Sequence, residues 1–203
     1  MIFLLISDNF MYNISVDLTT KGSFMKKIKS MSKKYRVIFQ LMLVLVIVVT
    51  PIFWLTVDTK IDIFSSIGMS SIYSPYINSP MLMSTRIFAI IVSLIPISIV
   101  SYALIALIRL FKFYEQGNIF SVETVNQYKK LGKALIFWFF GIMIYDALIS
   151  LVLTMNNPVG HRVISITIGG IDILAIIAGS VVLIISSVMQ QAQEIADENS
   201  LTI

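Results

Sequence analysis

Four long apolar runs dominate the chain. They occupy residues 37–57, 87–108, 134–155 and 163–189. The first run has twenty-one residues without a charge; at a helical rise of 1.5 Å per residue this is about 31 Å, which matches the hydrocarbon core of a bilayer. Because backbone N–H and C=O groups find no water inside a membrane, each run is expected to be helical. The pattern predicts an all-α, polytopic membrane protein with four transmembrane helices in an antiparallel bundle.

The composition agrees with a membrane protein and excludes several classes of site. The chain is 57% hydrophobic and 13% charged, whereas an ordinary soluble domain is about 25% charged. It has no cysteine, which excludes disulfides, thiolate metal sites and cysteine nucleophiles. The net charge of +4 is explained by membrane topology, so no direct binding to nucleic acid is expected.

The basic residues predict the orientation in the membrane. Seven Lys and Arg precede the first run and five lie within residues 109–133, whereas only Lys60, Arg86 and Arg162 would lie outside. Cytoplasmic loops are enriched in Lys and Arg. Both termini are therefore predicted to be cytoplasmic.

The two ends of the chain differ in character. Residues 1–24 contain one short apolar run, below the length of a signal-peptide core, and are expected to be disordered or to lie upstream of a true start at Met25 or Met31. Residues 25–36 form a basic cytoplasmic flank, and residues 190–203 form an acidic cytoplasmic tail.

The connection between the second and third runs carries a helix end followed by a helix start. Gly117 is expected to end the incoming helix and Ser121 to cap the next one, with Glu123 in its first turn. Apolar residues then recur every three positions, at Val122, Val125, Tyr128 and Leu131. We expect a short amphipathic cytoplasmic helix here, lying along the membrane before the third span.

Two carboxylates lie inside predicted spans. Asp146 and Asp172 are at similar distances from the turn near Pro158, so an antiparallel hairpin would place them at similar depth, with Ser150 and Ser165 on the same sides of their helices. A carboxylate near mid-bilayer costs about 2.5–3.5 kcal/mol and is a candidate functional group. One interpretation is a proton- or cation-binding site. The favoured one is a protonated pair, or acids bonded to Ser and Asn, that joins two helices.

Small residues in the fourth run indicate close helix packing. Ala175 and Gly179 form a small-x-x-x-small pair, which lets a neighbouring helix approach closely. Packing within one chain is favoured over a seam between two copies of a homo-oligomer.

Two motifs carry a family resemblance. Gly117-Asn118-Ile119-Phe120-Ser121 is followed by Leu131-Gly132, and the chain ends in Glu198-Asn199-Ser200-Leu201-Thr202-Ile203. These resemble the Gly-x-x-Phe-Ser/Thr turn and the terminal Glu-Asn-x-Leu-Thr-hydrophobic signature of domain-of-unknown-function family 2975. The resemblance implies a four-helix protein of the bacterial inner membrane. Members are often encoded beside a small helix-turn-helix regulator, and no catalytic residue can be transferred because no activity is established.

The leading interpretation of function is a non-enzymatic membrane protein that contacts a cytoplasmic protein, such as a transcriptional regulator. The candidate contact residues are Gly117, Phe120, Ser121, Glu123, Glu198 and Leu201. The alternative is a small proton- or cation-coupled transporter or channel that uses Asp146 and Asp172. The sequence contains no nucleotide-binding loop, hydrolase elbow or metalloprotease helix, so neither enzyme activity nor a cofactor or metal is expected.

Overall fold

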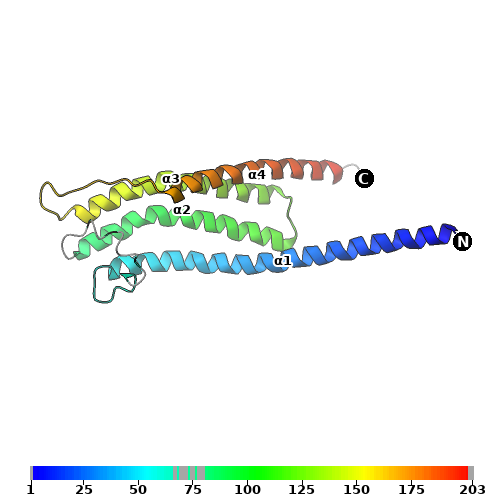
Figure 1. The fold of residues 1–203 in the computed structure, drawn as a ribbon, viewed down its shortest axis with the longest axis horizontal. Coiled ribbons are helices and arrows are strands. Elements are labelled where there is room, and N and C mark those ends of the chain that lie inside the picture. The colour runs from blue at the N-terminus through cyan, green and yellow to red at the C-terminus, as the bar shows by residue number, and fades with distance from the viewer. Residues whose placement is uncertain (1, 66–67, 69–72, 74–75, 77–80, 201–203) are drawn as a thin grey trace.

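The computed structural model describes residues 2–65, 68, 73, 76 and 81–200. This part of the chain is all-α, and its helices are α1 (Ile2–Thr56), α2 (Met83–Gln116), α3 (Val122–Thr154) and α4 (Gly170–Ser200) (Figure 1). Each contains a stretch long and apolar enough to cross a membrane: Met25–Thr56, Met83–Gln116, Val122–Thr154 and Gly170–Ile195. The predictions of an all-α fold and of four apolar helices are confirmed.

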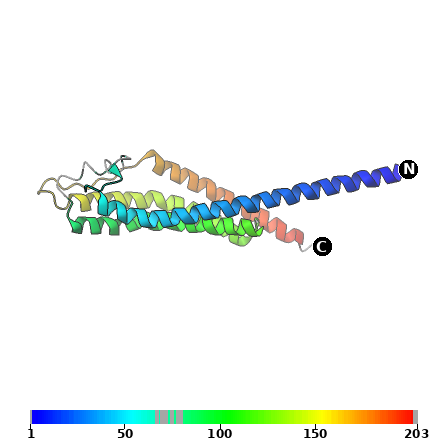
Figure 2. The same cartoon turned by 90° about the horizontal axis from the view of Figure 1, so that it is seen from below.

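The helices form a row in chain order. α2 packs against α1 and α3, and α4 packs against α3, while α1 and α4 make no helix contact in the described residues. Consecutive helices run in opposite directions in Figure 1, and Figure 2 shows α4 crossing the other three at an angle. The arrangement is thus an open row of helices, in which each helix packs on its neighbours in the sequence.

Polar contacts join α1 to α2 at both ends of their shared length. At one end the buried Arg86 donates from Nη1 to the carbonyl oxygens of Trp54 (3.0 Å), Leu55 (3.0 Å) and Val57 (2.7 Å). The last carbonyl groups of a helix lack partners within it and carry partial negative charge, so a guanidinium stabilises this end of α1. At the other end Arg36 and Glu115 form an ion pair at 3.1 Å. The sequence predicts for Arg86 only a position outside the cytoplasm, and its role at the end of α1 is seen only in the structure.

The turn between α2 and α3 is built as the sequence predicts. Gly117 has φ of 90°, a left-handed conformation that favours glycine, and its N–H donates to the carbonyl of Tyr114 at 3.1 Å. Ser121 then caps α3, because its side-chain oxygen accepts from the N–H of Thr124 at 3.3 Å. The predicted helix end and helix start are confirmed.

The separate amphipathic helix expected before the third span is replaced by the first turns of α3. Residues 122–154 form a single helix. Its early turns pack on other helices: the hydroxyl groups of Tyr128 and Tyr114 are 2.7 Å apart, and Ser186 of α4 donates to the carbonyl of Val125 at 3.4 Å. The apolar stripe is therefore used for packing on α2 and α4, and no proline interrupts the helix.

Helix continues toward both ends of the described residues. α1 begins at Ile2 and includes residues 2–24. That residues 1–24 are disordered, or lie upstream of a true start at Met25 or Met31, stays a prediction. The acidic tail continues α4 as far as Ser200.

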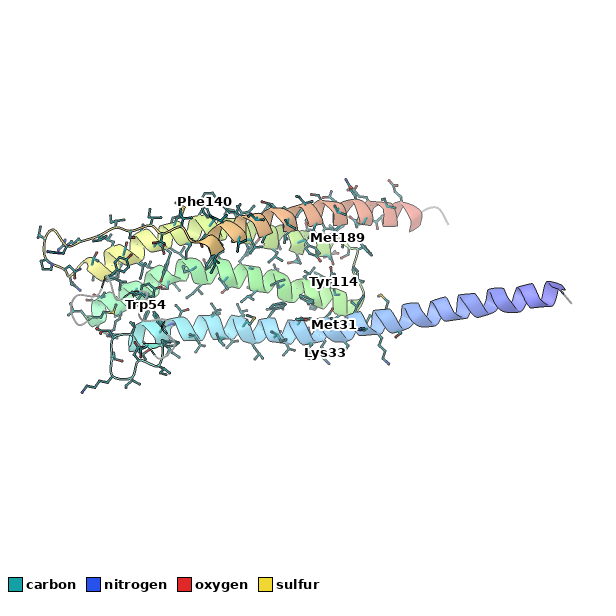
Figure 3. The ribbon with its side chains drawn as sticks, viewed as in Figure 1. Met31, Lys33, Trp54, Tyr114, Phe140 and Met189 are labelled. Atoms are coloured by element: carbon teal, nitrogen blue, oxygen red, sulfur yellow. The ribbon has the colours of Figure 1, made fainter. Side chains whose placement is uncertain are left out.

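The best-packed part of the protein lies at the end of the row opposite the α2–α3 turn. Its buried members come from α1, α2 and α3 and from the residue after α1: Phe53, Trp54, Val57, Ala89, Tyr145, Ile149 and Leu153. Trp54 lies between α1 and α2 (Figure 3) and donates from Nε1 to Ser93 Oγ at 2.7 Å. Tyr145, Ile149 and Leu153 of this core lie in the same turns of α3 as Asp146 and Ser150.

Candidate functional site

The fourth helix begins later than the sequence predicts. The expected span starts at residue 163, whereas α4 starts at Gly170 and residues 161–169 are not helical. Trp138, which lies near the middle of α3, donates from Nε1 to Asp172 Oδ1 at 3.2 Å. The first turn of α4 therefore lies beside the middle of α3, and the segment before it runs along the half of α3 that ends at Thr154 (Figure 2).

Side chains of α3 accept hydrogen bonds from alternate residues of this extended segment. The acceptors are spaced four residues apart on α3, and the donors two residues apart on the segment: Val163 N–H to Thr154 Oγ1 (3.2 Å), Ser165 N–H to Ser150 Oγ (2.9 Å) and Thr167 N–H to Asp146 Oδ2 (3.1 Å). Four helical residues rise about 6.0 Å and two extended residues about 6.6 Å, so the two spacings match. We call this set of contacts the polar ladder.

The polar ladder explains how a non-helical backbone lies beside a membrane-spanning helix. An extended segment cannot satisfy its own N–H groups, and each unsatisfied group in an apolar environment costs several kcal/mol. Thr154, Ser150 and Asp146 supply acceptors for three of these groups, and Asp172 Oδ2 accepts the N–H of Gly169 at 2.8 Å. The ladder thus ends at the first turn of α4.

The structure brings most of the predicted intramembrane site together. The site lies between α3 and the extended segment, whereas the sequence predicts it between two helices. Asp146, Ser150 and Ser165 line one pocket of about 220 Å³ with Tyr73 and Tyr76. Asp172 lies next along the ladder and is 9% exposed. Among the described residues no hydrogen bond joins the two carboxylates, since each accepts backbone N–H groups of the extended segment. The interpretation of the two acids as a protonated pair stays a prediction.

Small residues determine how closely α3 and α4 approach. A Cβ atom at Gly179 would lie 2.9 Å from the carbonyl oxygen of Gly132, and one at Gly132 would lie 3.0 Å from that of Gly179. Gly179 is therefore used for packing within the chain. A seam between two copies through Ala175 and Gly179 stays a prediction.

The predicted partner-contact residues lie at the opposite end of the row. Gly117, Phe120, Ser121 and Glu123 belong to the α2–α3 turn, where the Phe120 side chain is 54% exposed. Glu198 lies near the end of α4, which is at the same end of the molecule as this turn (Figure 1). Leu201 is outside the described residues.

A family model described as a protein of unknown function, DUF2975, matches residues 22–203. The chain belongs to this family. The DUF2975 match includes the apolar part of every helix, the turn at Gly117 and the whole polar ladder, and it confirms the resemblance inferred from the two motifs. No curated protein and no solved structure gives a match.

Membership of DUF2975 assigns no role to any residue, so the geometry must carry the functional argument. Within the described residues no three His, Asp or Glu side chains are placed to hold a metal ion. The polar ladder was not predicted, but the sequence contains its signal. Residues 164–169 alternate between isoleucine and a small or polar residue, as Ile-Ser-Ile-Thr-Ile-Gly, and alternation is the pattern of an extended strand rather than a helix.

Proposed function

We propose that this protein is a non-enzymatic, multi-pass protein of the bacterial inner membrane, and that its cytoplasmic end contacts a cytoplasmic protein such as a transcriptional regulator. Both termini face the cytoplasm in this proposal. The observation that carries it is the α2–α3 turn, which presents a large apolar side chain on a fixed backbone.

The turn is held by hydrogen bonds on both sides of Phe120. The N–H of Asn118 donates to the carbonyl of Phe113 at 3.0 Å, and the carbonyl of Asn118 accepts from Thr124 Oγ1 at 2.8 Å. Thr124 is fully buried, whereas Phe120 is 54% exposed. A rigid, exposed aromatic residue is a favourable anchor for a protein partner, because little conformational entropy is lost when it is covered.

Charges beside the turn indicate the chemistry of the partner. A groove of about 420 Å³ between α2 and α3 is lined by Arg109, Lys112 and Lys130, with Glu123 as its acidic member. A partner segment that carries acidic residues around an apolar pocket for Phe120 would complement this surface.

Site-specific photocrosslinking tests the proposal. A benzophenone amino acid at position 120 should crosslink to a cytoplasmic protein in living cells. Phe140 is a matched control, since it is 56% exposed but projects from the middle of α3, in the apolar part of the row (Figure 3). The same crosslinker at position 140 should give no cytoplasmic product.

A second variant tests the specificity of the crosslink. Lys112→Glu reverses one basic charge of the groove beside the turn and should reduce the yield at position 120 several-fold. If position 120 gives no cytoplasmic product, and deletion of the gene leaves the transcriptome unchanged, the proposed contact is wrong.

The orientation in this proposal is tested with topology reporters. A reporter fused after Ile203 should be active in the cytoplasm, and one inserted near Asn78 should be active outside. Activity of both on one side would contradict the proposed four crossings.

One observation favours the alternative of a proton- or cation-coupled transporter. Transporter sites are commonly built where a spanning helix is interrupted and its backbone groups face a polar residue, and here the extended residues 161–169 precede α4 beside Asp146. Ion-dependent flux in proteoliposomes that is abolished by Asp146→Asn, with the protein still folded, would support this function. Flux that is absent in both the parent and the variant would argue against it.

A further inference from the structure

A cavity lies between α1, α2 and α3, next to the well-packed end of the row. Its volume is about 360 Å³, and it is partly open to the surroundings. Its walls are apolar with several aromatic rings, among them Phe53, Trp54, Tyr73, Trp138 and Tyr145. An apolar cavity of about 150 Å³ is enough to bind benzene, so this one has room for a substituted ring.

One end of the cavity carries neutral hydrogen-bonding groups. Trp54 Nε1 donates to Ser93 Oγ at 2.7 Å, and Ser93 Oγ donates to the carbonyl of Ala89 at 2.8 Å. The hydroxyl groups of Tyr73 and Tyr145 are 3.1 Å apart. Burial raises the pKa of the Tyr73 phenol above its ordinary value, so this group stays a neutral donor.

The lining defines the chemistry of a ligand. Among the described residues no charged side chain lines the cavity, so an ionised phosphate or carboxylate would be buried without a counter-charge, which is strongly unfavourable. Aromatic side chains on several walls favour a planar ring, which they contact through offset stacking or ring edges. The hydrogen bond between the Tyr73 and Tyr145 hydroxyls uses only one of their two protons, so the other can be donated to a carbonyl oxygen on that ring.

We propose that this cavity binds a small lipid-soluble molecule with a planar ring and a ring carbonyl, of the quinone class. The ring occupies the aromatic cavity with its carbonyl oxygen toward the hydroxyl groups of Tyr73 and Tyr145, and an apolar tail extends into the surrounding lipid. A cavity of a few hundred Å³ with few polar groups is typical of small-molecule sites. The proposal is independent of the cytoplasmic contact described above.

The chain contains two tryptophans, Trp54 and Trp138, and both line the cavity. Intrinsic fluorescence therefore reports directly on its occupancy, because quinones quench tryptophan on contact. The full chain in lipid nanodiscs would be titrated with decylubiquinone, a benzoquinone with a short tail. Quenching should saturate with added quinone, and decanol at the same concentrations should not quench.

Matched variants separate binding in the cavity from quinone dissolved in the membrane. Val100→Phe fills part of the cavity and should raise the apparent Kd at least tenfold. Leu94→Phe introduces the same ring at an exposed position of the same helix that does not line the cavity, and it should leave the Kd unchanged. Tyr145→Phe removes one of the two paired phenol hydroxyls and should weaken binding several-fold without filling space.

Two results would overturn the proposal. Quenching that rises linearly and equally in the parent, Val100→Phe and Tyr145→Phe would show that the quinone acts only from the bilayer. Phospholipids with brominated acyl chains also quench tryptophan. If they do so here and decylubiquinone does not relieve the quenching, an ordinary acyl chain fills the cavity.

Discussion

The polar ladder makes a sharp prediction at Ser150. Its Oγ accepts the N–H of Ser165 at 2.9 Å, and the Ser150 side chain is 2% exposed. Ser150→Ala removes this acceptor and leaves the N–H of Ser165 without its partner in a largely apolar region. An unsatisfied buried donor costs about 1–3 kcal/mol, so we expect the free energy of unfolding to fall by that amount.

The control is Ser180→Ala on α4. Ser180 is exposed, and its hydroxyl donates to the carbonyl of Ile176 within the same helix, so its loss should change stability by less than about 0.5 kcal/mol. Both variants would be compared with the parent by denaturant titration in detergent micelles. Equal stability of the two variants would refute the reasoning.

Hydrogen exchange tests the same ladder without a mutation. In the parent protein the amides of residues 163, 165, 167 and 169 donate to side chains, whereas no described partner accepts from those of 164, 166 and 168. Protection should therefore alternate along the segment. Uniform protection of residues 163–169 would indicate that the fourth helix starts where hydropathy places it.

Three further predictions concern other parts of the structure. Arg86→Met removes the charged cap at the end of α1 and should cost about 1.5–3 kcal/mol in the same titration. Gly179→Ala places a Cβ against the carbonyl of Gly132 and should cost about 1–3 kcal/mol, whereas Gly170→Ala, with nothing within 4 Å, should be tolerated. Deletion of residues 1–24 should leave membrane insertion unchanged, as measured by fractionation. Loss of membrane insertion would contradict the late start.

The membrane-spanning helices were predictable because hydropathy alone decides them. A run of about twenty residues without charge has few stable states in a bilayer other than a helix. The α2–α3 turn was predictable for a different reason: Gly117 and Ser121 are residues whose local chemistry favours a helix end and a helix start.

The extended segment was missed because hydropathy does not distinguish two apolar conformations. Residues 163–169 are apolar enough to continue a span, and the alternation over residues 164–169 was the signal that they are extended. That signal is weak by itself, because an extended segment also needs hydrogen-bond acceptors for its N–H groups. Here Ser150 and Asp146 of α3 present acceptors at a matching spacing. The capping role of Arg86 was missed for the same reason, as it depends on carbonyl groups about thirty residues away in sequence.

The two carboxylates were treated as equivalent from the sequence, and the structure makes them different. Asp146 accepts one backbone N–H through Oδ2, so Asp146→Asn can present its amide oxygen to the same donor. Asp172 accepts through both oxygens, from Gly169 N–H and from Trp138 Nε1. An asparagine amide has only one oxygen, so in Asp172→Asn the NH2 group must face one of these two donors, which then loses its acceptor.

We expect Asp146→Asn to be about as stable as the parent and Asp172→Asn to lose about 1–3 kcal/mol, as for other buried donors without a partner. Thermal unfolding in detergent, with and without added cations, measures both effects. Equal losses in the two variants would show that the carboxylates act as a pair after all. A cation-dependent rise in melting temperature that Asp146→Asn abolishes would instead identify an ion site at the ladder, because a bound ion stabilises only the state that binds it.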